Sequence, residues 1–418
     1  MKRISVLASL LIFLSSLVQA QQFYLFVGTY TNTGSSASKP QMDSTGSRGI
    51  YVYRFDAGTG KARLLSHTKG VCNPSFLTVA PDGRHIYSCT DSRMLNAGTL
   101  SAFEFDRVHG RLRFINKAAS GGDNPAYVSV DSSGKWAAVA NYTGGSFGII
   151  PIRADGSVGP PALRMKFPGH GVNPVRQDKS HVHSTVISPD QRYLFVQDLG
   201  LDRITIFPWE ERADGNRGMQ IHEGQRSERA GENRGRQTTP VEAQATAPVD
   251  DSRETVVRTV PGSGPRHLTF GPDGRYAYLV EEMGGMVDVY RYDATAGKLD
   301  SIQRIAAHPD SCKGPYHGAD IHLSPDGKFL YTTNRSESSI AIFSVDKEKG
   351  TLRTVGYEPV FGKEPRNFML DPTGSWLLAA DQESGIIVVY RIDRETGLLT
   401  PLKERIKVPT PTCLRMMP

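Results

Sequence analysis

The sequence predicts an all-β protein built from a repeated unit of two hairpins, and three observations lead to this prediction. A hairpin pattern, with apolar residues alternating on both sides of an Asp/Gly turn, recurs along the chain of 418 residues. A second alternating hairpin follows each copy. The resulting unit holds four strands in about 50 residues, which is typical of one blade of a β-propeller.

The first hairpin of each unit, which we call the inner hairpin, occurs in six complete copies. Each copy has a short apolar strand, a turn such as Pro-Asp-Gly, and a second apolar strand that ends in polar residues. The copies read NPSFLTVAPDGRHIYSCTD, NPAYVSVDSSGKWAAVANY, HVHSTVISPDQRYLFVQDL, PRHLTFGPDGRYAYLVEE, GADIHLSPDGKFLYTTNR and PRNFMLDPTGSWLLAADQ.

The second hairpin, which we call the outer hairpin, occurs seven times, from GIYVYRFDAGTGKARLL to IIVVYRIDRETGLLTPL. Seven outer copies and six complete inner copies leave one blade to be shared by the two ends of the chain. FYLFVGTYT, from Phe23, matches the second strand of an inner hairpin, and PTCLRMMP at the C-terminus supplies the first. We therefore predict a single seven-bladed β-propeller whose last blade is closed by both termini, which removes exposed sheet edges. The alternative, two separate β-domains, has no linker in the right place.

Two segments fall outside the repeat. Residues 1–20 have a basic start, an apolar run and a small-residue site before Gln21, which predicts a cleaved signal peptide; a membrane anchor is the alternative. Residues 211–253 are rich in Arg, Glu, Gln and Gly and poor in aliphatic residues, which predicts a disordered insertion in an outer hairpin or, as an alternative, a partner-binding loop. We expect a periplasmic or secreted protein without a membrane span after cleavage, and a monomer.

The composition argues against several classes of function. The formal net charge of +6 is spread along the chain, so we do not expect nucleic-acid binding. The four cysteines have no metal-binding spacing, and CxxC, HExxH, GxSxG and a GxGxxG in a strand-to-helix context are missing. We expect no metal and no cofactor.

The candidate site follows from where the inner hairpins begin and end. The two free ends of a hairpin are adjacent, so residues at equivalent positions form two rings on one face of a propeller. Asn or Thr would suffice to cap strands there, whereas His183, Arg266, Glu282 and Arg335 exceed that need and predict a ligand site. Strand capping alone is the alternative. The further ring residues that we predict to contact substrate are Asn73, Asn124, Asn141, His181, Asp198, His267, Asp320, Arg366 and Gln382.

The ordered motifs resemble those of the lactonase family of seven-bladed propellers. These motifs are FVGTYT, GIYVYRFD, ANYTGGS, SHVHSTVISPD, GSGPRHLTFGPDGRYAYLVEE, IHLSPDGKFLYTTNR and EPRNFMLDPTG, spread over about residues 23 to 415. The family includes bacterial 6-phosphogluconolactonase and the fungal carboxymuconate lactonising enzyme. The resemblance implies a catalytic set of His183, Arg266, Glu282 and Arg335.

This set fits the opening of a lactone. Glu282 or His183 can take the proton of an attacking water, and Arg266 and Arg335 can stabilise an oxyanion or hold a phosphate or carboxylate. We expect a metal-independent hydrolase for an anionic sugar lactone, similar to 6-phosphogluconolactonase. Two alternatives remain: a lactonising cyclase of the carboxymuconate type, and a non-catalytic exported propeller that binds a carbohydrate or a protein.

Overall fold

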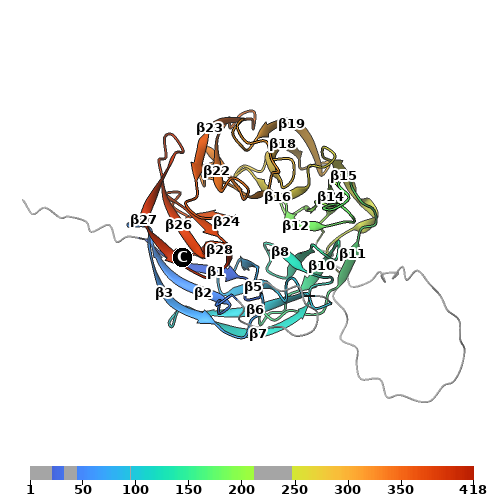
Figure 1. The fold of residues 1–418 in the computed structure, drawn as a ribbon. Coiled ribbons are helices and arrows are strands. Elements are labelled where there is room, and N and C mark those ends of the chain that lie inside the picture. The colour runs from blue at the N-terminus through green and yellow to red at the C-terminus, as the bar shows by residue number, and fades with distance from the viewer. Residues whose placement is uncertain (1–20, 33–44, 95, 211–246) are drawn as a thin grey trace, which may run out of the picture.

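A computed structural model describes residues 21–32, 45–94, 96–210 and 247–418. These residues form seven four-stranded antiparallel sheets arranged around one axis, as Figure 1 shows. The predicted signal peptide at 1–20 and residues 211–246 of the predicted insertion lie outside the described residues. The sequence-based prediction of a seven-bladed β-propeller is confirmed.

Each blade runs from an inner strand near the axis to an outer strand at the rim, and we number the blades along the chain. Blades 1 and 2 consist of β4 (Phe76–Val79), β5 (His85–Thr90), β6 (Thr99–Asp106) and β7 (Arg111–Ala119), then β8 (Pro125–Val130), β9 (Trp136–Asn141), β10 (Ser146–Pro151) and β11 (Leu163–Lys166). Blades 3 and 4 consist of β12 (Val182–Ile187), β13 (Tyr193–Asp198), β14 (Arg203–Pro208) and β15 (Thr255–Arg258), then β16 (Pro265–Phe270), β17 (Tyr276–Glu281), β18 (Met286–Asp293) and β19 (Lys298–Ala306). Blades 5 and 6 consist of β20 (Gly318–Leu323), β21 (Phe329–Asn334), β22 (Ser339–Val345) and β23 (Leu352–Pro359), then β24 (Pro365–Leu370), β25 (Trp376–Asp381), β26 (Ile386–Ile392) and β27 (Leu399–Lys407).

Blade 7 joins the two ends of the chain, as predicted. Its order is β28 (Pro411–Met417), β1 (Gln22–Thr29), β2 (Ile50–Asp56) and β3 (Lys61–Thr68). The C-terminal strand β28 pairs antiparallel with the N-terminal strand β1, for example Phe26 with Arg415. Figure 1 shows this blade as the place where the red and blue ends of the chain meet.

The inner strands close the ring. Each inner strand contacts the inner strand of the next blade, and β28 contacts both β24 and β4. Apolar side chains fill the space between neighbouring blades, for example Phe147 and Phe207 of blades 2 and 3, whose ring centroids lie 5.4 Å apart. This rigid ring fixes the residues that face the axis.

The last residues of the predicted insertion are packed against blade 3. Val249 pairs with Trp209 in a β-bridge, and the side chains of Ala247 and Val249 are buried in the core between blades 2 and 3. A single 3-10 turn, η1 (Asp251–Arg253), then leads into β15. Residues 247–253 are thus ordered, against the prediction, because two apolar side chains in this stretch find a core to enter. Among the described residues, no helix has the length and apolar content needed to cross a membrane.

Candidate functional site

A β-bulge recurs at the start of the inner strands. In six of the seven inner strands the pairing with the second strand shifts near the strand start, which leaves an extra residue there. In blades 3, 4 and 6 the extra residue is His183, Arg266 and Arg366, respectively. A bulge re-aims a side chain and is frequent beside active sites. The bulges of blades 2 and 7 carry only Ala126 and Thr412.

A second ring comes from the residue that follows the second strand of each blade. Its backbone N–H donates to a carbonyl just before the inner strand in all seven blades, for example from Glu282 to Gly264 at 2.8 Å and from Arg335 to His317 at 3.0 Å. The ring consists of Tyr30, Asp91, Tyr142, Leu199, Glu282, Arg335 and Gln382. One backbone hydrogen bond per blade therefore fixes residues of very different chemistry.

The two rings bring together the four residues that we predicted to be catalytic. The carboxylate of Glu282 lies 3.0 Å from Nε of Arg266, 3.1 Å from a terminal nitrogen of Arg335 and 3.5 Å from Nε2 of His183. All four side chains are nearly buried, with Arg266 1% and Glu282 4% exposed. Burying a charge costs free energy unless the charge is paired, so four polar groups buried together are not needed merely to end a strand.

The sequence interpretation missed a third guanidinium in the cluster. Arg176 lies in the connection between β11 and β12, donates to Oε1 of Glu282, and lies 3.4 Å from the hydroxyl of Tyr142. Its side chain is 33% exposed, the most exposed of the three arginines on Glu282. The repeat could not reveal Arg176, because no other blade has this connection.

The charges of the cluster shift the pKa values of its members. Burial alone would raise the pKa of Glu282, but Arg335, Arg266, His183 and Arg176 together hold it well below its usual value. Burial, reinforced by the nearby Arg335, lowers the pKa of Arg266 to about 9 despite its pairing with Glu282. At neutral pH the cluster therefore holds an ionised carboxylate among three positive guanidiniums, and an excess of positive charge remains.

His183 is held as a neutral imidazole. Burial, together with the positive charge of Arg266, keeps the pKa of His183 well below 6.5. Its Nε2 faces Glu282, whereas its buried Nδ1 has no hydrogen-bond partner among the described residues. The carboxylate favours a proton on Nε2, which leaves the lone pair of Nδ1 free to accept one.

Two of the predicted substrate-binding residues, His267 and Asp320, form a hydrogen-bonded network next to Arg266. Nδ1 of His267 lies 2.7 Å from Asp320, and the His267 ring lies 3.3 Å from a terminal nitrogen of Arg266. Asp320 also accepts hydrogen bonds from Asn367 and His322. Substrate contact by His267 and Asp320 stays a prediction; of the two, His267 contacts Arg266 directly, and Asp320 holds His267.

Asn73 and Asn124 tie loops together. Oδ1 of Asn73 accepts from the backbone N–H groups of Thr31 and Asn32, at 2.9 and 2.8 Å, and its Nδ2 donates to Ser92. Oδ1 of Asn124 accepts from the backbone N–H of Arg93 at 2.9 Å. Substrate contact by these two residues stays a prediction, but their side chains already position the loops that carry Tyr30 and Arg93.

Three other predicted ligands are engaged with their own blades. Nδ2 of Asn141 lies 3.2 Å from the carbonyl of Ser120. Asp198 accepts from the backbone N–H groups of His181 and Gly200, and the His181 ring lies between Asp178 and the carbonyl of Tyr142. Asn141 and Asp198 end their strands, and the following residue in each case is the one that belongs to the second ring. Their contact with substrate stays a prediction.

Arg366 and Gln382, both from blade 6, belong to the bulge ring and the second ring, respectively. The guanidinium of Arg366 lies 5.5 Å from the ring centroid of Tyr30, over which Arg93 also lies, at 3.8 Å. Oε1 of Gln382 is buried without a hydrogen-bond partner among the described residues. These groups extend the polar surface around the axis beyond the Glu282 cluster.

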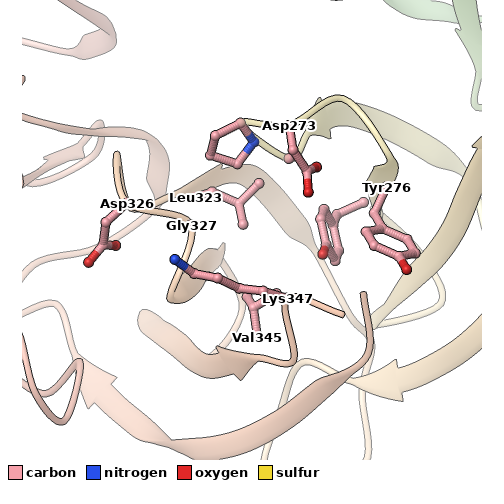
Figure 2. A pocket seen from close by; sticks show the side chains of 10 residues that line it. Asp273, Tyr276, Leu323, Asp326, Gly327, Val345 and Lys347 are labelled. Carbon is pink, nitrogen blue, oxygen red and sulfur yellow. The ribbon is translucent and has the colours of Figure 1, made fainter. Parts of the chain in front are cut away.

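The opposite face of the propeller carries grooves of a different kind. Figure 2 shows a pocket of about 130 Å³ between the turns of blades 4 and 5, with Asp273, Tyr276, Asp326 and Lys347 at its wall. Asp273 is paired with the neighbouring Arg275 at 2.7 Å. This pocket does not bring a buried base and an arginine cluster together, so the face around Glu282 is the stronger candidate.

Comparisons with known proteins agree with the seven-bladed propeller fold. The sequence model described as "Lactonase, 7-bladed beta-propeller" matches residues 24–225 and 242–416. A 6-phosphogluconolactonase of Formosa agariphila is 35% identical over 349 residues, which are 83% of this chain and 86% of the relative. A 6-phosphogluconolactonase of Bacillus subtilis is 30% identical over 395 residues, covering 94% and 97% of the two chains. The solved structure of a periplasmic gluconolactonase of Pseudomonas aeruginosa superposes with a TM-score of 0.77 at 33% identity, covering 95% of this chain and 99% of that one. The chain therefore belongs to the lactonase family of seven-bladed β-propellers.

Proposed function

We propose that this protein is a lactone hydrolase that opens an anionic sugar lactone of the 6-phosphogluconolactone type. The observation that carries the proposal is the cluster of His183, Arg266 and Arg335 around Glu282, which combines a neutral base with an excess of positive charge. The names of the relatives, 6-phosphogluconolactonase and gluconolactonase, support the same reaction class.

His183 acts as the general base. Its free Nδ1 takes a proton from a water molecule as the water oxygen attacks the lactone carbonyl carbon. Glu282, on the other side of the ring, stabilises the imidazolium that forms. Glu282 is the weaker candidate, because Arg176, Arg266 and Arg335 already contact its carboxylate oxygens, whereas Nδ1 of His183 has a free lone pair. This assignment selects His183 from the two candidate bases.

The arginines stabilise the negative charge of the reaction. Attack on the carbonyl creates an oxyanion, and fixed guanidiniums that face it need no reorganisation. Arg266 is fixed by Glu282 and by the carbonyl of Ala319, and Arg335 by Glu282 and the carbonyl of His317. Collapse of the intermediate breaks the ring C–O bond, and the proton held by His183 passes to the leaving alkoxide oxygen. The product is an open hydroxy acid.

We further propose that the protein acts after export to the periplasm or outside the cell. The pattern of residues 1–20 supports a cleaved signal peptide, and the related solved structure from Pseudomonas aeruginosa is named a periplasmic protein. An exported enzyme would act on a lactone formed outside the cytoplasm, and its natural substrate could then differ from the cytosolic sugar phosphate.

The test is a lactone panel with the mature protein and with His183→Gln. We expect the wild type to open 6-phosphogluconolactone or gluconolactone well above the spontaneous rate, and His183→Gln to lower kcat/KM by about 10² or more, the scale for loss of a general base. The control is His85→Gln. His85 is also buried, but it lies in blade 1 beside the hairpin turn, where it pairs with Asp82 at 2.6 Å. Absence of hydrolysis by the wild type, or equal effects of both variants per folded molecule, would overturn the proposal.

A further inference from the structure

A second group of positive charges lies on the side of the axis formed by blades 6, 7 and 1. Tyr30 of blade 7 is buried, and its ring has the guanidinium of Arg93 from blade 1 at 3.8 Å and that of Arg366 from blade 6 at 5.5 Å. The Glu282 cluster, in contrast, comes from blades 3, 4 and 5 and the connection that leads into blade 3.

These two arginines lack an anionic partner within the described part of the chain. No ion pair joins Arg93 or Arg366 to a carboxylate there, whereas Arg176, Arg266 and Arg335 all contact Glu282. Both side chains are partly shielded from solvent. Guanidiniums that share an aromatic ring repel each other, so their proximity is stabilised when an anion lies between them.

The fold holds this group in place with structural devices of its own. Arg93 has a left-handed backbone, with φ of 64°, and its N–H is fixed by Asn124. Asn73 ties the backbone of Thr31 to that of Ser92, and thereby joins the loops that follow Tyr30 and precede Arg93. Arg366 occupies the bulge position that holds Arg266 in blade 4 and His183 in blade 3. Such support is typical of a preorganised site.

The pKa of Tyr30 reflects the positive charges around it. Burial alone would raise the pKa of its phenol, but Arg366, Arg93 and, from the other cluster, Arg266 together lower it. Because Arg266 and Arg366 also disfavour the positive form of His183, the two groups act in one continuous field around the axis. The charges of each group therefore act on residues of the other.

We infer that Tyr30, Arg93 and Arg366 form a subsite for an anionic group of the substrate that is remote from the lactone carbonyl. This inference rests on the proposed function and deepens it, because it separates two tasks: the cluster around Glu282 acts on the carbonyl, and the second group binds a phosphate or carboxylate. Guanidiniums bind both groups by charge-assisted hydrogen bonds, and the Tyr30 hydroxyl can add one more.

Binding of open-chain acids tests the subsite without turnover. The probes are gluconate, which has no anion at its far end, glucarate, which has a carboxylate there, and 6-phosphogluconate, which has a phosphate. By calorimetry we expect the wild type to bind at least one of the doubly anionic acids about tenfold or more tightly than gluconate, and Arg366→Met to abolish that preference. The probe that gains most identifies the anion.

The matched control is Arg391→Met, since Arg391 also belongs to blade 6 and lies over an aromatic ring, that of Trp376 at 5.9 Å, but on the exposed outer side. It should keep the preference. Tyr30→Phe retains the ring and removes only the hydroxyl, so it probes the same group where Arg366→Met fails to fold, and it should weaken the preference. Equal affinity for all three acids in the wild type, or a preference that survives in both Arg366→Met and Tyr30→Phe, would overturn the inference.

Failure of the subsite and failure of the proposed function give different results. A protein that opens lactones but binds the three acids equally would retain the proposed function without this subsite. A protein that prefers a doubly anionic acid through Arg366 but opens no lactone would retain the subsite without the activity.

Discussion

The hairpin of β16 and β17 has an ion pair at each of its two ends, and the two pairs differ in almost every physical respect. At the turn, Asp273 and Arg275 lie two residues apart and are 45% and 56% exposed in their side chains. At the open end, Arg266 and Glu282 come from different strands, and their side chains are 2% and 5% exposed.

The turn pair belongs to a repeated device. In blades 1, 3, 4 and 5 the Asp of the turn accepts a hydrogen bond from the backbone N–H two residues later; these aspartates are Asp82, Asp190, Asp273 and Asp326. The open-end pair has no counterpart in the other blades, where the equivalent positions hold for example Ala126 and Tyr142. The turn device thus recurs between blades, as a structural feature does, whereas the open-end residues differ between blades, as we expect of the proposed catalytic site.

The largest expected effect separates the two ends of this hairpin. Arg266→Met should lower lactone hydrolysis by about 10² or more, because it removes an oxyanion donor. Glu282 keeps Arg335 and Arg176 as partners, so the variant should still fold. Asp273→Asn at the turn should leave kcat/KM unchanged, since solvent screens an exposed pair. Steady-state kinetics and melting curves of both variants measure the contrast.

The reverse outcome would assign the open-end charges to strand capping. In that case Arg266→Met would melt early yet hydrolyse normally per folded molecule. The distinction between a repeated, structural end and a variable, functional end would then not hold for this hairpin.

The sequence predicted the blades well because every blade repeats the same local physics. Alternating apolar residues and Asp/Gly turns specify hairpins, and the count of hairpins specified the closure of blade 7 by β28 and β1. The rings around the axis could also be predicted, but the bulges at the starts of the inner strands could not, because they depend on the pairing register rather than on composition.

Residues outside the repeat were harder to predict. Arg176 lies in the connection between blades 2 and 3, which no other blade repeats, and the sequence did not show that the amides of Asn73 and Asn124 bind neighbouring loops. Only contacts between distant segments distinguish a side chain that binds substrate from one that positions a loop.

The next expected effect is the pH dependence of kcat/KM, which tests the proposed roles of His183 and Arg266 at the open end of the hairpin. In the proposed mechanism His183 acts in its neutral form, so activity should rise with pH through its pKa, which burial and Arg266 hold well below 6.5. Arg266 would act in its protonated form, so activity should fall as the pH rises through about 9. We expect kcat/KM, corrected for spontaneous hydrolysis, to be on a plateau at neutral pH. Arg266→Lys should move the alkaline limb to lower pH, since lysine has the lower intrinsic pKa. An acid limb centred near the usual histidine value would contradict the role of His183.

The smallest effect compares two buried carboxylates at equivalent positions, Glu281 at the end of β17 and Asp381 at the end of β25. Glu281 binds Arg304 through both of its oxygens, at 2.8 Å each. Asp381 is 0% exposed, and neither of its oxygens has a hydrogen-bond partner among the described residues. Burial raises the pKa of Asp381 to about 8, only partly opposed by Arg405. The paired carboxylate should therefore stabilise its blade, and the unpaired one should destabilise it.

The pH dependence of unfolding shows whether the Asp381 carboxylate stabilises or destabilises the folded protein. Between the usual value near 3.8 and about 8, folded Asp381 holds a proton that the unfolded chain has lost, so its contribution to stability declines as the pH rises through this window. Asp381→Asn mimics the protonated form and should remove that decline, so its gain in the free energy of unfolding over the wild type should grow as the pH rises through the window. Glu281→Gln, the matched change, should instead lower stability, because it removes the two-oxygen ion pair with Arg304, which then keeps only the longer contact of 3.6 Å to Asp288. Denaturant midpoints of the wild type and both variants, measured at acidic and at mildly alkaline pH, test the pair. If Asp381→Asn follows the same pH dependence as the wild type, Asp381 is ionised in the folded protein, and its carboxylate must then have a partner that compensates its charge.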